Sequence, residues 1–271
     1  MKPIESMALV VNPSKSGARE LAEEICRHPS LKKDHCLIMD SFPLHHSALD
    51  DFDVCCVIGG DGTILGVVAE AFRAQKPILG VNLGKLGFLA TYTPDEIRDR
   101  IGQVIAGDYC TDQRSVIRCK LNDGSAQIAL NDLVIKGNSI NLIRLKVFHN
   151  EKRVAEYNAD GLIFATSTGS TAYNLSAGGP ILHPQTRSIA MTPICAHTLS
   201  NRGIIFPETA ELRVECDCDS YLPNVSVDGR PLAESSSLFP MEISVEKDRI
   251  TLLHDPDYSH YQMLRTKLNW V

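Results

Sequence analysis

The segment DVCCVIGGDGTILGVVAEAF, residues 53–72, joins a continuous apolar run to a glycine-rich turn and a helical pattern. The run VCCVI has the length of a strand that is covered on both faces, as in a parallel sheet. The glycines around Asp61 mark a turn, and the residues after it predict a helix over 64–73. Strand, turn and helix in this order indicate an α/β layer.

The same alternation continues through the first third of the chain. A helix over 93–107 should open with Thr93, Pro94 and Glu96, a capping box with proline in the first turn, and should end at Gly107. Another helix is predicted over 16–28. Strands are predicted at 7–12, 36–39 and 77–82. This region is therefore expected to form an open α/β sheet.

Beyond about residue 110, alternating apolar and polar residues indicate half-buried strands. Hairpins are predicted around NDGS at 122–125 and around Asn150 and Glu151. A helix is expected after TSTGS at 166–170, and another over 257–270. Further strands are expected at 115–121, 127–137, 142–150, 153–166, 211–216, 224–229, 241–246 and 249–254.

The change of pattern predicts two domains in a chain of 271 residues. An α/β domain is expected at 1–110 and a β-rich domain at 111–255. The C-terminal helix, 256–271, is expected to return to the first domain.

Composition limits the partners and the location of the protein. A formal net charge of −6 argues against a broad surface for nucleic acids or anionic membranes. The N-terminus lacks the apolar stretch of a signal peptide, and no run of about 18 apolar residues is present, so we expect a cytoplasmic protein with no membrane partner.

The nine cysteines give no strong signal of a metal site. Cys55 and Cys56 lie in an apolar strand, where reduced thiols act as small apolar groups. Cys216 and Cys218 could suggest a metal site, but no second Cys/His pair at zinc-finger spacing accompanies them, so we interpret both as strand residues.

Asp61 stands where ligands bind in open α/β sheets, beyond the carboxyl end of a strand. Glycines let the backbone approach a ligand there, and the N–H groups at the start of a helix favour phosphate oxygens. A carboxylate would repel phosphate, but it can take a proton from a hydroxyl that attacks a phosphoryl group. The alternative is an ordinary Asp-Gly turn whose aspartate caps the next helix.

A second segment, NADGLIFATSTGSTAYNLSAGGPIL at 158–182, is rich in glycine and hydroxyl groups. Its hydroxyls around Gly169 could present several hydrogen-bond donors to a polar ligand. The alternative is a tight loop packed against a neighbouring domain or subunit. The hydroxyl residues concerned are Thr166, Ser167, Thr168, Ser170 and Thr171.

Together the two segments resemble the NAD kinase family, enzymes that use ATP or polyphosphate to phosphorylate the 2′-hydroxyl of the adenosine ribose of NAD. GGDGT alone is shared with lipid kinases, whereas GSTAYNLSAGGP, 169–180, is far more specific. The resemblance covers nearly the whole chain and also includes NLGKLGFL at 82–89, LND at 130–132, PICAHTLSNR at 193–202, VDG at 227–229 and LRTKLNW at 264–270.

The resemblance implies a Rossmann-like N-terminal domain that binds nucleotide, and a β-sandwich-like C-terminal domain that binds NAD and mediates assembly into a homodimer or homotetramer. It makes Asp61 the catalytic base and implies Mg²⁺ or another divalent cation together with ATP. Asp228 would reach the ligand from a neighbouring subunit. The other residues implied at the nucleotide are Gly60, Gly62, Leu65, Phe88, Asn131, Asp132, Asp160, Thr171, Ala172, Tyr173, Ser176 and His197.

Some of these positions also have a purely structural interpretation. Phe88 and Tyr173 could be core aromatics, and His197 could be a structural histidine. Asp132 stands where the family has glutamate, which is one methylene longer.

Two other functions fit parts of the sequence. GGDGT is compatible with a lipid kinase, but no membrane-facing segment accompanies it. A dinucleotide-binding regulator without catalysis is the second alternative, and the retained Asp61 argues against it.

Overall fold

The computed structural model describes residues 1–31, 35–84, 87–138, 142–197, 202–217, 222–232 and 238–270. The chain divides into two compact units. The first unit contains Met1–Gln113 and Ile250–Val271, and the second contains Arg114–Arg249. The chain enters the second unit in strand β5 (Cys110–Lys120) and leaves it in strand β16 (Met241–His254).

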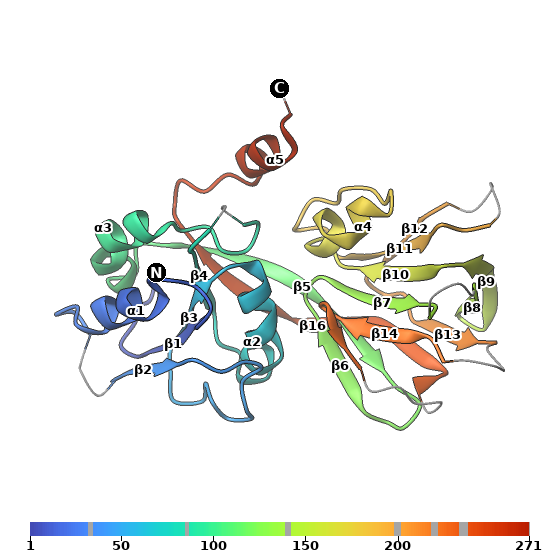
Figure 1. Ribbon diagram of the computed structural model, residues 1–271, viewed down its shortest axis with the longest axis horizontal. Helices are drawn as coiled ribbons and strands as arrows, with labels where there is room; N and C mark the ends of the chain where they lie inside the picture. Colours follow the sequence, from blue (N-terminus) through green and yellow to red (C-terminus); the bar gives the residue numbers. More distant parts are fainter. Residues whose placement is uncertain are drawn as a thin grey trace. The chain divides into compact units, whose positions relative to one another are not determined.

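A parallel sheet forms the centre of the first unit. Its strand order is β2-β1-β3-β4, and the last residues of β16 pair in parallel with β4. Helices α1 and α3 lie on one side of these strands and α2 on the other (Figure 1). The bounds are β1 (Met7–Val11), α1 (Ala18–Cys26), β2 (Cys36–Met39), β3 (Val54–Gly59), α2 (Asp61–Ala74), β4 (Ile78–Asn82), α3 (Pro94–Ile105) and α5 (His260–Leu268).

The strands β1 and β3 are buried along their whole length, because helices cover both faces of this sheet. The predicted capping box of α3 is confirmed: the Thr93 hydroxyl accepts from the N–H of Glu96, and the Glu96 carboxylate accepts from the N–H of Thr93. Gly107 follows the helix with φ +97°, a left-handed angle that glycine adopts without strain.

One predicted helix boundary of the first unit needs correction. Helix α2 begins at Asp61 rather than at residue 64, and Gly60 is its N-cap residue. The predicted C-terminal helix forms as α5; it buries Met263 and Leu264, whereas Tyr261 is 60% exposed.

The second unit consists of two antiparallel sheets. In one, the order is β16-β13-β8-β9, with β5 pairing to β16 and β6; in the other it is β12-β11-β10-β7-β14-β15. The bounds are β6 (Ala126–Ala129), β7 (Asp132–Lys136), β8 (Ile143–His149), β9 (Lys152–Ala159), β10 (Gly161–Ala165), η2 (Gly169–Thr171), α4 (Tyr173–Ser176), β11 (Ser188–Ile194), β12 (Ile204–Pro207), β13 (Leu212–Cys216), β14 (Asn224–Val227) and β15 (Arg230–Pro231).

Strand β10 shows how the two sheets pack. Leu162 and Phe164 join the core that both sheets share, whereas Ile163 and Ala165 point to the opposite face and pack near Leu182. Alternate side chains of a strand face opposite sides, so β10 is buried on both. The predicted combination of an α/β domain and a β-sandwich-like domain is confirmed.

Several predicted strands divide or merge in the structure. The segments 127–137 and 153–166 each contribute to both sheets, as β6 with β7 and β9 with β10. The segments 241–246 and 249–254 are one continuous strand, β16. The helix expected after TSTGS is reduced to a 3-10 turn and the four residues of α4.

Both predicted hairpins form. β5 pairs with β6 across a turn in which Gly124 has φ +86°, and β8 pairs with β9 across Asn150 and Glu151, whose φ angles are +50° and +60°. Among the described residues, no helix has the length and hydropathy needed to cross a membrane.

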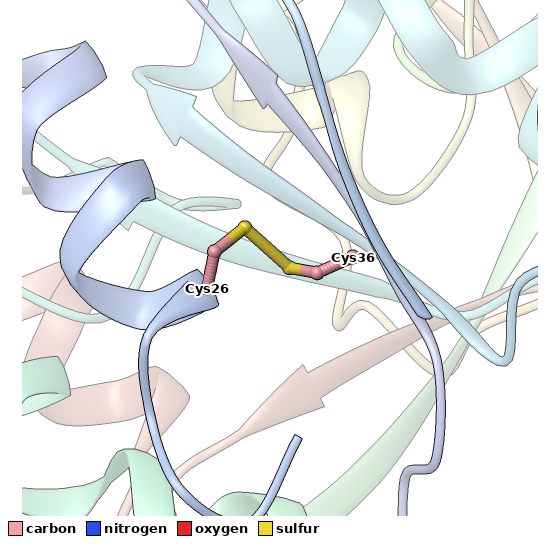
Figure 2. Close-up of a disulfide and its surroundings, with 2 residues drawn as sticks. All are labelled: Cys26 and Cys36. Atoms are coloured by element: carbon pink, nitrogen blue, oxygen red, sulfur yellow. A yellow bond between two sulfur atoms is a disulfide. The ribbon is translucent and has the colours of Figure 1, made fainter. Parts of the chain in front are cut away.

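A disulfide joins Cys26 at the end of α1 to Cys36 at the start of β2 (Figure 2). The sequence did not indicate this bond, because a separation of 10 residues carries no signal of its own. Cys55 and Cys56 are free and buried, as expected, and Cys216 is a strand residue. Cys218 lies outside the described residues.

Candidate functional site

The carboxylate of Asp61 lies at the junction of β3 and α2 and binds the segment that follows β4. Its Oδ2 accepts from the N–H of Phe88 at 2.8 Å, and its Oδ1 accepts from the N–H groups of Leu89 and Ala90 at 3.1 and 3.0 Å. Asp61 is therefore not a simple helix cap: its side chain reaches across to another loop of the same unit, and it remains partly exposed.

Polar residues at the carboxyl ends of β1 and β4 surround this junction. The side-chain amide of Asn12 donates to the Thr63 hydroxyl at 3.2 Å, and the Asn82 side chain accepts from the N–H of Gly84 at 2.8 Å. A Cβ on Gly59 would lie 2.5 Å from the Thr63 hydroxyl, so the turn needs glycine there. Sequence reasoning missed Asn12 and Asn82, although each stands at the carboxyl end of a predicted strand.

Phe88 is half-buried, which lies between the two interpretations from the sequence, an exposed nucleotide contact and a core aromatic. Its ring lies 6.5 Å from the ring of His260, the first residue of α5, at an interplanar angle of 49°. No pattern in the sequence connects His260 with the LGFL segment. Gly60, Gly62 and Leu65 surround the start of α2 and are at least partly exposed, with Gly62 exposed to solvent.

In the second unit, Asp228 holds the LND segment. Its Oδ2 accepts from the N–H of Leu130 at 2.9 Å, and its Oδ1 accepts from the N–H groups of Asn131 and Asp132 at 2.7 and 3.2 Å. Asp228 is only 6% exposed. The resemblance implies that Asp228 reaches a ligand from a neighbouring subunit; in this chain its carboxylate is buried and bonded to the LND segment.

Asp132 is also buried and lies beside this carboxylate. Burial and the neighbouring charge of Asp228 raise the pKa of Asp132 to about 7. Burial raises the pKa of Asp228 as well, although its hydrogen bonds from Leu130, Asn131 and Asp132 act in the opposite direction. Asp132 can therefore change its protonation near neutral pH.

The TSTGS turn is fastened to the LND segment. The Thr166 hydroxyl donates to the carbonyl oxygen of Leu130 at 2.5 Å, and the N–H of Gly169 donates to the Thr166 hydroxyl at 3.0 Å. A Cβ on Gly169 would lie 2.0 Å from the carbonyl oxygen of Asn131, so only glycine fits. The turn thus lies directly against Asn131.

Several hydroxyls of this turn form hydrogen bonds to backbone groups of the chain, which leaves fewer of them for a ligand. Ser170 donates to the carbonyl oxygen of Ser167 at 2.6 Å and accepts from the N–H of Leu182 at 2.9 Å, and Ser167 donates to the carbonyl oxygen of Pro184 at 3.0 Å. Thr166, Ser167, Thr168 and Ser170 are buried. These residues therefore form a tight loop that is held by hydrogen bonds within its own unit.

The residues just after the turn remain open to solvent. Thr171 and Ala172 are half-buried, Ser176 is exposed, and Tyr173 is 37% exposed. Tyr173 is therefore not a core aromatic. Together with Asn131, these side chains offer a polar surface with one aromatic ring at one end of β7 and β10.

Asp160 and His197 lie at the other end of β10. The N–H of Asp160 donates to the carbonyl oxygen of Ile194, and the N–H of His197 donates to that of Asn158, both at 3.0 Å. Both residues are exposed, so His197 is not a buried structural histidine. Since the five residues of β10 span about 16 Å, one chain does not bring this pair together with Asn131.

The described residues contain no group of three or more His, Cys, Asp or Glu side chains that could hold a metal ion. The Asp61 carboxylate already accepts three N–H groups. The described acidic residues, with the Asp61 carboxylate already bonded to three N–H groups, fit a divalent cation that arrives on the phosphates of a nucleotide better than a cation held by protein ligands alone.

Family models match both parts of the chain: that of the ATP-NAD kinase N-terminal domain matches residues 41–109, and that of the C-terminal domain matches residues 130–247. An NAD kinase of Psychrobacter arcticus is 40% identical over 224 residues, 80% of this chain and 69% of that protein. An NAD kinase of Chromohalobacter salexigens is 37% identical over 224 residues, 80% of this chain and 76% of that protein.

Solved structures are similar over nearly the whole chain. A yeast NADH kinase complexed with NADH has a TM-score of 0.85 and 25% identity, with coverage of 100% of this chain and 89% of that one. An NAD kinase from Archaeoglobus fulgidus in complex with ATP has a TM-score of 0.78 and 21% identity, with coverage of 97% and 98%. On these sequence and structural similarities, the chain belongs to the NAD kinase family.

Proposed function

We propose that this protein is an NAD kinase, which transfers the terminal phosphoryl group of ATP to the 2′-hydroxyl of the adenosine ribose of NAD and forms NADP and ADP. The observation that carries the proposal is Asp61, a carboxylate in a glycine turn at the carboxyl end of β3, in a chain of the NAD kinase family. Polyphosphate is the second candidate donor, because backbone N–H groups can bind either chain of phosphates.

Asp61 acts as the general base in this proposal. It takes the proton of the 2′-hydroxyl while the ribose oxygen attacks phosphorus, and ADP leaves with the bridging oxygen. Gly60 and Gly62 let the backbone approach the phosphates beside the start of α2, where N–H groups favour negative charge. Positioning and electrostatics supply most of the rate in such a reaction.

The donor enters as a complex of ATP with Mg²⁺ or another divalent cation. A cation bound to the phosphates would neutralise charge on them as the bridging bond breaks. Binding through the phosphates of ATP suits a protein whose described residues contain no group of three or more acidic, His or Cys side chains that could hold the cation. The cation is then part of the donor substrate.

For NAD, we propose contacts at the end of the second unit where the LND segment lies. Asn131, Thr171, Ala172, Tyr173 and Ser176 form the open surface beside the LND segment, with Asp132 next to it. Leu65 and Phe88 are proposed as apolar contacts in the first unit.

Asp160 and His197 lie about one strand length from Asn131. We propose that they contact the nucleotide bound to a neighbouring copy of the chain. This role implies a homodimer or homotetramer, and we propose the cytoplasm as its location.

The test is NADP formation by purified protein with NAD and Mg-ATP or polyphosphate, read with a coupled NADP-specific dehydrogenase. Turnover with either donor is expected. Diacylglycerol and a sphingoid base are tested as acceptors in parallel, and phosphorylation of either lipid without NADP formation would favour a lipid kinase. Tight NADP binding without turnover on any donor would favour a dinucleotide-binding regulator.

A further inference from the structure

We propose that the turn from Gly87 to Ala90 is a positioning device for Asp61: it fixes the carboxylate and leaves Oδ2 as the atom that accepts the substrate proton. The inference rests on the proposed function and adds a positioning residue, Gly87, to it.

Three successive N–H groups of this turn converge on one carboxylate. The N–H of Phe88 donates to Oδ2 of Asp61 at 2.8 Å, and those of Leu89 and Ala90 donate to Oδ1 at 3.1 and 3.0 Å. The turn itself is closed by the N–H of Gly87, which donates to the carbonyl oxygen of Ala90 at 3.3 Å. Hydrogen bonds to a charged acceptor are among the stronger ones in proteins, so the carboxylate is held in one orientation.

The distribution of these bonds distinguishes the two oxygens of Asp61. An ionised carboxylate offers about two acceptor positions on each oxygen. Oδ1 accepts two N–H groups, whereas Oδ2 accepts one. The remaining acceptor position is therefore on Oδ2, and it is there that the proton of the attacking hydroxyl is transferred.

Gly87 is required by the position of this carboxylate. A Cβ at residue 87 would lie 1.9 Å from Oδ1, 2.5 Å from Cγ and 2.6 Å from Oδ2 of Asp61, and these are its three nearest atoms. The backbone angle of Gly87 is outside the left-handed region, so space alone excludes other residues. At Gly84, in the same connection, a Cβ would come no closer than 3.6 Å to the side-chain oxygen of Asn82.

Phe88 links the base to the proposed nucleotide contact. Its N–H fixes Oδ2 of Asp61, while its ring lies beside that of His260. A displacement of the turn would therefore move the aromatic contact and release the carboxylate at the same time.

A double-mutant cycle over Gly87 and Asp61 tests the inference in the full-length protein. Gly87→Ala is expected to lower the thermal unfolding midpoint of the wild type, because the added Cβ collides with the carboxylate. In the Asp61→Ala background the same substitution is expected to cause little or no further loss, since the colliding atoms are absent. Gly84→Ala is the matched control and should leave the midpoint unchanged.

Turnover gives a second cycle on the same proteins. Gly87→Ala is expected to reduce kcat for NADP formation on the order of 10²–10⁴-fold, the loss typical of a misplaced general base. Added to Asp61→Ala, it should reduce kcat no further. The inference would be overturned if Gly87→Ala had the kcat of the wild type. It would also be overturned if Gly87→Ala reduced kcat by the same factor in the wild type and in Asp61→Ala.

Failure to fold is also informative. If Gly87→Ala is unfolded while the double variant folds, the collision with Asp61 is supported. If neither folds although Asp61→Ala does, Gly87 is needed for another reason and the inference is wrong. Absence of NADP formation by the wild type would instead remove the proposed function, and the unfolding midpoints would still test the contact between Gly87 and Asp61.

Discussion

Asp132 and Asp228 are joined by two hydrogen bonds that run in opposite directions. The N–H of Asp228 donates to the carbonyl oxygen of Asp132 at 2.9 Å, and the N–H of Asp132 donates to Oδ1 of Asp228 at 3.2 Å. Two buried carboxyl groups are thereby kept side by side, an arrangement that disfavours the charge of both.

This arrangement predicts that Asp132 makes the protein less stable as the pH rises. Its pKa is about 7 in the folded protein, against an ordinary value of 3.8. The folded state therefore holds a proton that the unfolded chain has lost, so stability falls as the pH rises between about 4 and 7. A pKa rise of this size corresponds to at most a few kcal/mol in the free energy of unfolding.

The measurement is thermal unfolding of the wild type and Asp132→Asn at pH 5 and pH 8. The variant lacks the titrating group, so its unfolding midpoint relative to the wild type should be higher at pH 8 than at pH 5. Asp95→Asn, at a carboxyl that is 94% exposed, serves as the control and should show no such change. An Asp132→Asn difference that is the same at both pH values would contradict the prediction.

Asp228→Asn should disturb the LND segment. The amide has nearly the shape of the carboxylate and tolerates the left-handed φ of +49° at this position. However, its NH₂ group would oppose at least one of the N–H groups of Leu130, Asn131 and Asp132. We expect a loss of about 1–3 kcal/mol in the free energy of unfolding and a higher KM for NAD, because Asn131 is displaced.

Urea unfolding and the KM for NAD measure the two effects of Asp228→Asn. Asp217→Asn is the matched control in the same unit, because Asp217 is an exposed residue that pairs with Lys146 at the surface. An unchanged free energy of unfolding in Asp228→Asn would show that the three N–H groups do not need a carboxylate.

The disulfide between Cys26 and Cys36 predicts a stability that depends on redox conditions. It closes a short loop between α1 and β2, and a bond of this kind typically contributes about 2–4 kcal/mol. Dithiothreitol should therefore lower the unfolding midpoint of the wild type. The variant Cys26→Ser/Cys36→Ser should start lower and should not respond to reductant. A wild-type midpoint that is equal with and without dithiothreitol would contradict this.

Local patterns were sufficient to predict much of this fold. The apolar run at 54–58, the capping box at Thr93 and the turn around Asn150 each specify structure within a few residues of themselves. The division of 127–137 and of 153–166 between two sheets could not be predicted in this way, because it depends on pairing with strands that lie far away in the sequence.

The candidate site shows the same limit. The sequence singled out Asp61 and Asn131, but not that backbone N–H groups 27 to 29 residues from Asp61 would hold its carboxylate. Likewise, the hydroxyls of Thr166, Ser167 and Ser170 could be interpreted as ligand donors until the structure showed that they donate to backbone carbonyl oxygens of the same unit.

Asp61 is proposed as the general base of an NAD kinase. In Asp61→Asn, the amide NH₂ would face at least one of the N–H groups of Phe88, Leu89 and Ala90. The unfolding midpoint of this variant must therefore be measured together with its activity.

The most direct measurement is kcat for NADP formation from NAD and Mg-ATP by the folded wild type, Asp61→Asn and the surface control Asp95→Asn. We expect turnover by the wild type and the control, and a loss on the order of 10²–10⁴-fold in folded Asp61→Asn. Wild-type turnover in Asp61→Asn, or no NADP formation by the folded wild type with ATP or polyphosphate, would contradict it.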